Sequence, residues 1–128
     1  MNKITICDKE YEISCNAFTR FEYKKIFGVG IFEDIQKLNT FTQEQESLRK
    51  KLQVEGLEEA EIEERISGQM INKVDDFLDV LERIAYILIY TANKEVGSFE
   101  EWLKSIAKID LSADWIKVVT EFAVNSFC

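Results

Sequence analysis

The sequence predicts a mainly α-helical single domain of the α+β class, with an N-terminal β-hairpin packed on a helical core. Apolar and polar residues alternate near the N-terminus, and in the rest of the chain the apolar residues recur at the spacing of a helix. None of the 128 residues is proline, so long helices are not interrupted. Residues 74–92 begin as an amphipathic helix and become apolar all round from Ile84 onward. Because such a helix must be covered on every side, the other elements are expected to pack around it.

Composition limits the classes of partner. A chain of 128 residues, 46% of them hydrophobic, can bury a substantial core. Its net charge of −8 opposes contact with nucleic acid or anionic lipid. No signal-peptide-like run is present at the N-terminus, and the longest apolar run, residues 84–90, is too short to span a membrane. We therefore expect a cytoplasmic protein with neither a nucleic-acid nor a membrane partner.

Residues 3–15 are predicted to form the β-hairpin. With a two-residue turn at Asp8-Lys9, Ile6 faces Tyr11 and Ile4 faces Ile13 across the ribbon. These four apolar residues then lie on one side and the polar residues on the other. Since an isolated two-stranded ribbon is marginally stable in water, its apolar side is expected to pack on the helices.

Residues 16–41 are predicted to be helical. Asn16 is a suitable N-cap for a helix that ends at Gly28, a residue type that favours helix C-termini. Residues 28–30 form a tight joint, and residues 31–38 again show helical spacing. Residues 39–41 are interpreted as a loop.

Residues 42–69, which we call the arm, differ in composition. Glutamate occupies eight positions between Glu44 and Glu64, the apolar stripe is thin, and Gly56 and Ser67-Gly68 indicate breaks. One interpretation is two short charged helices, or a partly mobile segment, extending from the core. A compatible second interpretation is a surface for self-association or partner docking, because a narrow stripe buries little within its own domain.

Residues 70–128 are predicted to complete the helical core. After the central helix, residues 93–97 form a loop, and Ser98 with Glu101 has the spacing of a capping box. That box opens an amphipathic helix expected to continue to Ile109. A final helix is expected to begin after Ser112.

Few residues of the sequence are candidates for catalysis or metal binding. Histidine is absent, which excludes the usual catalytic triads, and the three cysteines lack the paired spacing of metal ligands. Asp75, Asp79 and Glu82 share a helix face and could bind a hard cation or act as an acid–base pair, but stabilisation of the helix dipole explains them more simply. We expect no catalytic residues, no cofactor, no metal and no enzymatic activity.

Aromatic residues are the remaining functional signal. Any Trp or Phe side chain left exposed would be a natural anchor for a helical partner. The candidate partner-binding residues are Phe32, Trp102, Trp115, Phe122 and Phe127.

Several segments resemble a known family when they are taken in order. The first group is Ile4-x-Ile6, Lys9-Glu10-Tyr11-Glu12-Ile13, an aromatic-rich helix closing on Phe27-Gly28, and Ile31-Phe32-x-Asp34-Ile35. The second is Ile89-Tyr90-Thr91-Ala92-Asn93, a short polar loop, and Ser98-Phe99-Glu100-Glu101-Trp102-Leu103. Their order and spacing resemble the tail assembly chaperones of long-tailed phages and prophages of Gram-positive bacteria. Two features depart from the family: Asp8 replaces Asn-Gly-like turn residues, and the arm has no counterpart.

The resemblance implies a non-enzymatic assembly factor in the cytoplasm of the bacterial host. Such proteins bind the tape-measure protein, keep it soluble while tail-tube subunits polymerise around it, and are absent from the mature virion. In many cases a frameshift-extended form recruits the tail tube protein, and a homo-oligomer is a further expectation. The alternatives are a structural tail or head–tail connector protein of the virion, or an acidic regulatory or antitoxin-like binding module.

Overall fold

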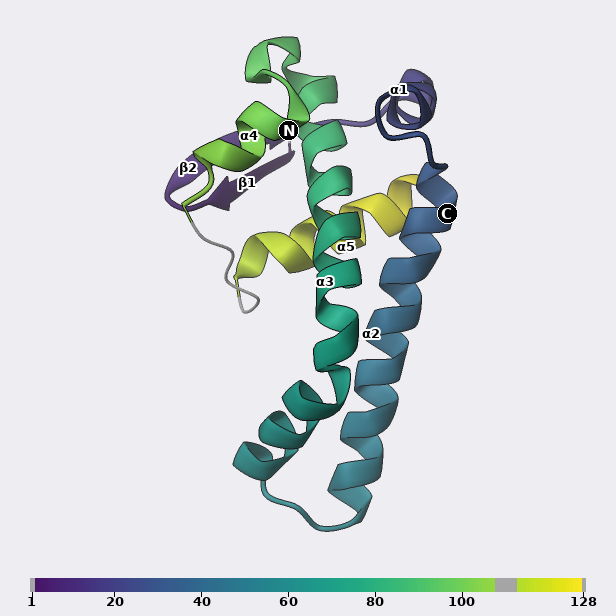
Figure 1. Ribbon diagram of the computed structural model, residues 1–128, viewed down its shortest axis with the longest axis vertical. Coiled ribbons are helices and arrows are strands. Elements are labelled where there is room, and N and C mark those ends of the chain that lie inside the picture. The colour runs from purple at the N-terminus through teal and green to yellow at the C-terminus, as the bar shows by residue number, and fades with distance from the viewer. Residues whose placement is uncertain (1, 108–112, 128) are drawn as a thin grey trace.

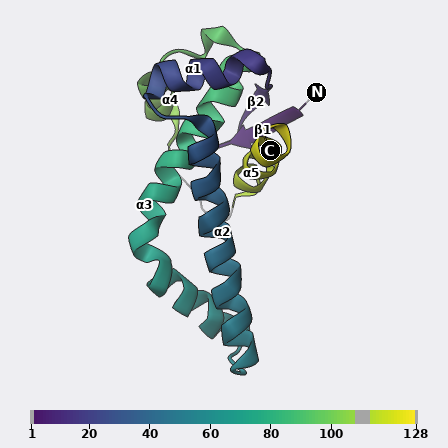
Figure 2. The same ribbon diagram turned by 90° about the vertical axis from the view of Figure 1, so that its right-hand side faces the viewer.

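The computed structural model describes residues 2–107 and 113–127, except for the side chain of Phe127. Two long helices lie side by side and the remaining elements gather around one end of them (Figures 1 and 2). In chain order the elements are β1 (Asn2–Ile6), β2 (Lys9–Ile13), α1 (Ala17–Phe27), α2 (Ile31–Val54), α3 (Glu59–Ala92), the short 3₁₀ helix η1 (Lys94–Val96), α4 (Phe99–Ser105) and α5 (Asp114–Phe127). This arrangement confirms the predicted mainly helical α+β domain with an N-terminal hairpin.

The hairpin has the predicted faces but a different turn. Its buried side consists of Ile4, Ile6, Tyr11 and Ile13. Ile4 pairs with Tyr11 and Asn2 with Ile13, so the predicted pairings of Ile6 with Tyr11 and of Ile4 with Ile13 are both wrong. The turn is Cys7-Asp8 instead of Asp8-Lys9, with φ values of 51° and 67°. A two-residue turn with positive φ at both positions matches the twist of the strands, and a register shift of two residues leaves every side chain on its original face.

Helix α1 has the predicted ends. The Asn16 side chain accepts hydrogen bonds from the backbone N–H groups of Phe18 (2.9 Å) and Thr19 (3.2 Å), and the Thr19 hydroxyl accepts one from the Asn16 N–H at 3.1 Å. Gly28 ends the helix in the left-handed conformation, with φ of 77°. Thr19 and Tyr23 are buried, so this face of α1 packs on the core.

Helices α2 and α3 are longer than predicted. The predicted loop at residues 39–41 and the predicted break at Ser67-Gly68 are both wrong, because α2 runs for 24 residues and α3 for 34. The Phe41 ring stacks on Phe77, 4.3 Å between centroids, and this contact holds residues 39–41 in α2. A glycine inside a helix costs only about 1 kcal/mol, which packing can outweigh. The predicted break at Gly56 is confirmed, with φ of 83°.

The arm is a two-helix hairpin with a small core of its own. Four buried residues form this arm core: Leu52, Ile62, Ile66 and Met70. Arg49 also joins the two helices, with ion pairs to Glu59 at 2.8 Å and to Glu63 at 2.6 Å. The arm is therefore charged and helical, but it consists of the ends of two long helices that continue into the main body, not of two short helices.

The main core surrounds the second half of α3. Its fully covered stretch runs without interruption through Ile84, Ala85, Tyr86, Ile87, Leu88 and Ile89. Strand β2 and helices α1, α2, α4 and α5 all contact α3, as predicted for a helix that is apolar all round. The Ser14 N–H donates a hydrogen bond to the Leu88 carbonyl at 3.1 Å, which ties the end of the hairpin to α3.

The C-terminal elements follow the prediction in part. The Ser98–Glu101 capping box is confirmed, with reciprocal hydrogen bonds of 3.1 and 3.2 Å. Helix α4 ends at Ser105, earlier than predicted, and Ile109 lies outside the described residues. Across the part of the chain that the structure describes, no helix combines the length and apolar character needed to cross a lipid bilayer.

One charged group is buried where α1, α2 and α3 meet. The Asp34 carboxylate is fully buried. Its Oδ2 accepts a hydrogen bond from the Tyr23 hydroxyl. The same oxygen lies 3.1 Å from Nε and 3.0 Å from Nη2 of the Arg83 guanidinium. Its Oδ1 lies 3.8 Å from the Lys37 ammonium. Burial raises the pKa of the Tyr23 hydroxyl, and the hydrogen bond to Asp34 raises it further, while Arg83 lowers it. We call Tyr23, Asp34 and Arg83 the Asp34 cluster.

Asp34→Asn is expected to destabilise the fold. The amide keeps the shape but leaves Arg83 without its counter-charge, and breaking a buried ion pair costs about 3–5 kcal/mol. Because the Arg83 side chain is 23% exposed, we expect about 2–3 kcal/mol here. Urea denaturation measures the loss, with the exposed neighbour Glu33→Gln as control. A loss smaller than about 0.5 kcal/mol, within the range of ordinary surface substitutions, would show that the cluster is not stabilising.

Asp8→Gly is expected to stabilise the hairpin. Asp8 has φ of 67°, a conformation that glycine adopts freely and that costs other residues roughly 1 kcal/mol. Thermal unfolding should show a higher Tm for Asp8→Gly and a lower Tm for the β-branched control Asp8→Val. Equal Tm values for the two variants would rule out backbone strain at this turn.

Candidate partner-binding surface

Two aromatic side chains project from α1 into solvent. Phe18 is 57% exposed and Phe21 is 56% exposed, and their rings stack with centroids 5.3 Å apart. The opposite side of the helix is fixed by the buried Thr19 and Tyr23, and its start is fixed by the Asn16 cap. Neighbouring exposed apolar groups are typical of interaction sites, and here they are held on a rigid element.

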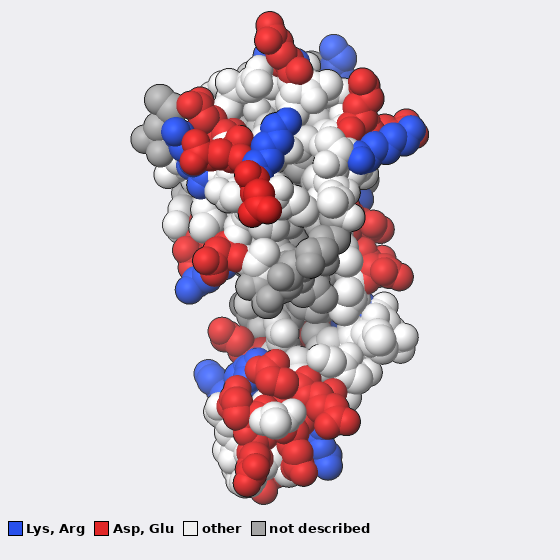
Figure 3. Space-filling model, turned by 90° about the vertical axis from the view of Figure 1, so that its left-hand side faces the viewer, with Lys and Arg blue, Asp and Glu red and all other residues white. Residues whose placement is uncertain are grey.

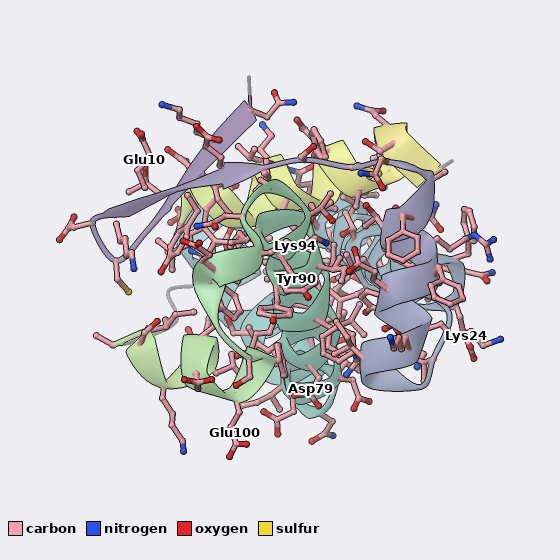
Figure 4. All side chains as sticks on the ribbon, turned by 90° about the horizontal axis from the view of Figure 1, so that it is seen from above. Glu10, Lys24, Asp79, Tyr90, Lys94 and Glu100 are labelled. Atoms are coloured by element: carbon pink, nitrogen blue, oxygen red, sulfur yellow. The ribbon has the colours of Figure 1, made fainter. Side chains whose placement is uncertain are left out.

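Positive charge lies beside these rings on α1. Arg20, Lys24 and Lys25 are exposed on α1, and none of the three forms an ion pair with another described residue. Figure 4 shows Lys24 extending outward from α1, away from the rest of the molecule. We call Phe18, Phe21, Arg20, Lys24 and Lys25 the aromatic-basic face.

The one carboxylate of α1 is neutralised from outside the helix. Glu22 accepts a hydrogen bond from the Lys94 ammonium at 2.7 Å, and its side chain is only 13% exposed. The same ammonium lies 4.2 Å from the centroid of the Tyr90 ring (Figure 4). The charge that α1 presents to solvent is therefore positive, although the whole chain carries −8.

Carboxylates gather at the other end of the molecule. Figure 3 shows them crowded over the arm, whose acidic residues are Glu44, Glu46, Glu55, Glu58, Glu59, Glu61, Glu63 and Glu64. Helix α1 lies at the opposite end of the long axis from the arm tip (Figure 2). The arm therefore carries an excess of negative charge, whereas the charge that α1 presents to solvent is positive.

The structure places the five predicted anchors in different environments. Phe32 is 49% exposed near the start of α2. Trp102 and Trp115 are buried in the main core, so their side chains are not exposed to a partner. Phe122 is half-buried against the same core, and the side chain of Phe127 lies outside the described residues.

Sequence reasoning missed Phe18 and Phe21 as anchors. The signal that could have found them is their spacing of three residues, which puts both rings on the side of α1 opposite Tyr23. Three cations on the same helix are a second signal. Trp102, by contrast, packs inward against Tyr86, with ring centroids 5.8 Å apart.

A groove of about 780 Å³ runs between α2 and α3. At the arm side an ion pair joins Lys73 to Glu44, and the stacked rings of Phe41 and Phe77 line the wall. Arg83, which lines the other end, is held by Asp34. Because two ion pairs and one ring stack join α2 to α3 along this groove, its arrangement is that of a helix–helix contact.

The acidic face of α3 carries one perturbed carboxyl. Burial raises the pKa of Glu82, the nearby Asp79 raises it further, and Arg83 opposes the shift. Within the described ranges, no three Cys, Asp or Glu side chains come close enough together to hold a metal ion.

Comparisons with known proteins gave no match to a family model, to a curated protein or to a solved structure.

Glu82→Gln is expected to raise stability at neutral pH. A carboxyl with a raised folded-state pKa favours folding while it is protonated, below its unfolded value of about 4.3, and loses that contribution as pH rises through the folded value. The variant should therefore have a higher Tm than the parent at pH 7, and the difference should vanish near pH 4. Glu64→Gln, an exposed position on the same helix, is the control. A Tm difference that does not change with pH would contradict this account.

Proposed function

We propose that this chain is a phage tail assembly chaperone that binds the tape-measure protein and keeps it soluble during tail-tube assembly. The observation that carries the proposal is the exposed ring pair Phe18–Phe21 on a rigid helix. A long helical protein that waits for its tube exposes an apolar stripe, and aromatic anchors on a facing helix can cover such a stripe.

The charge distribution supports this role. A chain of net charge −8 that coats a filament at intervals gives the coated filament a like charge, which opposes its collapse and aggregation. The acidic arm lies away from the aromatic-basic face, so its carboxylates would face solvent in such a complex (Figures 2 and 3).

The family resemblance supports the same role. The segments that carry it fall on β1, β2, the joint between α1 and α2, the end of α3, and α4. These elements build the main core and position α1. On this proposal the protein acts in the cytoplasm of the bacterial host, leaves before the virion matures, and recruits the tail tube protein through a frameshift-extended form.

The ring pair gives the sharpest test. In co-purification with the tape-measure protein encoded beside it, the parent chain should form a complex at micromolar concentration. Phe18→Ser with Phe21→Ser should weaken that complex at least tenfold, because truncating a buried aromatic anchor costs about 1–2 kcal/mol or more. The control pair Val54→Ser with Ile71→Ser removes two apolar side chains, 88% and 65% exposed, one on the arm and one just beyond it on α3, and should change affinity by less than about twofold.

Two results would count against the proposal. One is the absence of any complex with the tape-measure protein at micromolar concentration. The other is recovery of the chain from purified virions by mass spectrometry, which would instead favour a structural tail or connector protein.

A further inference from the structure

We infer that the helix that docks on α1 carries an acidic border beside its apolar stripe, and that Arg20, Lys24 and Lys25 recognise this border. The inference rests on the proposed function, because it specifies the chemistry of the segment of the tape-measure protein that α1 would bind. It concerns a partner helix of one kind: apolar along one line and rich in Asp or Glu along its edge.

The helical spacing places the cations beside the rings. Arg20 and Lys24 are four residues apart and line one edge of the ring pair. Lys25 follows Phe21 by four residues and Phe18 by seven, so it continues the line of the rings by one turn. A helix packed against the rings would therefore have ammonium and guanidinium groups along one side and at one end.

These cations are available to a partner. Their charges are not met by other described residues, and the nearest carboxylate on α1, Glu22, is engaged by Lys94 at 2.7 Å. Long cationic side chains can also lay their apolar stems along a docked helix while their charged ends reach its border. Carboxylates on the partner would then be the matching groups.

The remote negative charge of the arm does not cancel this local effect. At physiological ionic strength, charges separated by more than about 8 Å are largely screened. The arm tip and α1 lie at opposite ends of the molecule (Figure 2), so α1 presents its own charge to a docked segment. The same net charge of −8 disfavours a nucleic acid, whose extended backbone would run past the acidic surface.

Two synthetic helices test the inference. Both would be amphipathic peptides of about 20 residues with the same leucine stripe, a length that spans about 30 Å. One would carry Glu and the other Lys beside the stripe. Exposed ion pairs are individually weak, so three together should favour the Glu peptide by about tenfold at low salt, and this preference should shrink as salt is raised. Fluorescence anisotropy of labelled peptides measures both affinities.

A charge reversal locates the effect. Lys24→Glu with Lys25→Glu should invert the preference, so that the Lys peptide binds more tightly. Lys50→Glu with Lys51→Glu makes the same change in net charge on the arm, and should leave the preference intact. Phe18→Ser with Phe21→Ser should weaken both peptides alike. Circular dichroism would verify that each variant keeps the helical content of the parent.

Several outcomes would overturn the inference. Equal affinity for the two peptides, or a preference that Lys24→Glu with Lys25→Glu does not change, would show that the cations do not recognise the partner. A complex with the tape-measure protein could still form, so neither result would contradict the proposed function. Tighter binding of a single-stranded DNA oligonucleotide than of the Glu peptide would assign the face to nucleic acid. Sedimentation velocity would detect self-association of the parent chain. If the α1 charge reversal abolished that self-association, the aromatic-basic face would be assigned to a second copy of this chain.

Discussion

The need to cover one helix on every side determines the arrangement of this protein. From Ile84 to Ile89 each successive side chain of α3 is buried, so no turn of this stretch faces solvent. A helix satisfies its backbone hydrogen bonds internally, which is why it can be surrounded completely. The hairpin contributes its one apolar side, and the remaining helices contribute apolar stripes. The hairpin and the short helices α1, α4 and α5 are each too small to be stable alone, so these covering elements and the covered helix depend on one another.

The buried ion pair connects this core to the surface. Asp34 receives hydrogen bonds from Tyr23 on α1 and Arg83 on α3, and so relates the three helices at a single point. Buried ion pairs contribute less to net stability than their strength suggests, since both charges lose their hydration. A buried ion pair nevertheless requires its charged groups and their hydrogen-bond donors to keep fixed positions. With Tyr23 held inward, the opposite side of α1 must face outward, and this orientation is what exposes Phe18 and Phe21.

Local patterns predicted the elements better than they predicted how far each one extends. The hairpin faces, the helix caps and the central helix all follow from neighbouring residues, and all were predicted. The continuity of α2 depends on Phe41 meeting Phe77, a contact between residues far apart in the chain. Exposure of aromatic side chains has the same origin. Trp102 is buried and Phe18 exposed because of how α4 and α1 sit on α3. The spacing of Phe18 and Phe21 puts their rings on one side of α1, but which side of α1 faces the core is decided by contacts with residues far away in the chain.

The arm core has a consequence for motion. Leu52, Ile62, Ile66 and Met70 pack with one another and not with the main core, although α3 runs unbroken through both. Cooperative units of a protein follow its packing, not its secondary structure, so the arm can open sub-globally while the body stays folded. Amide protons in the first half of α3 would then exchange with solvent through a smaller free-energy gap than those in the second half. On this packing, one continuous helix would span two cooperative unfolding units.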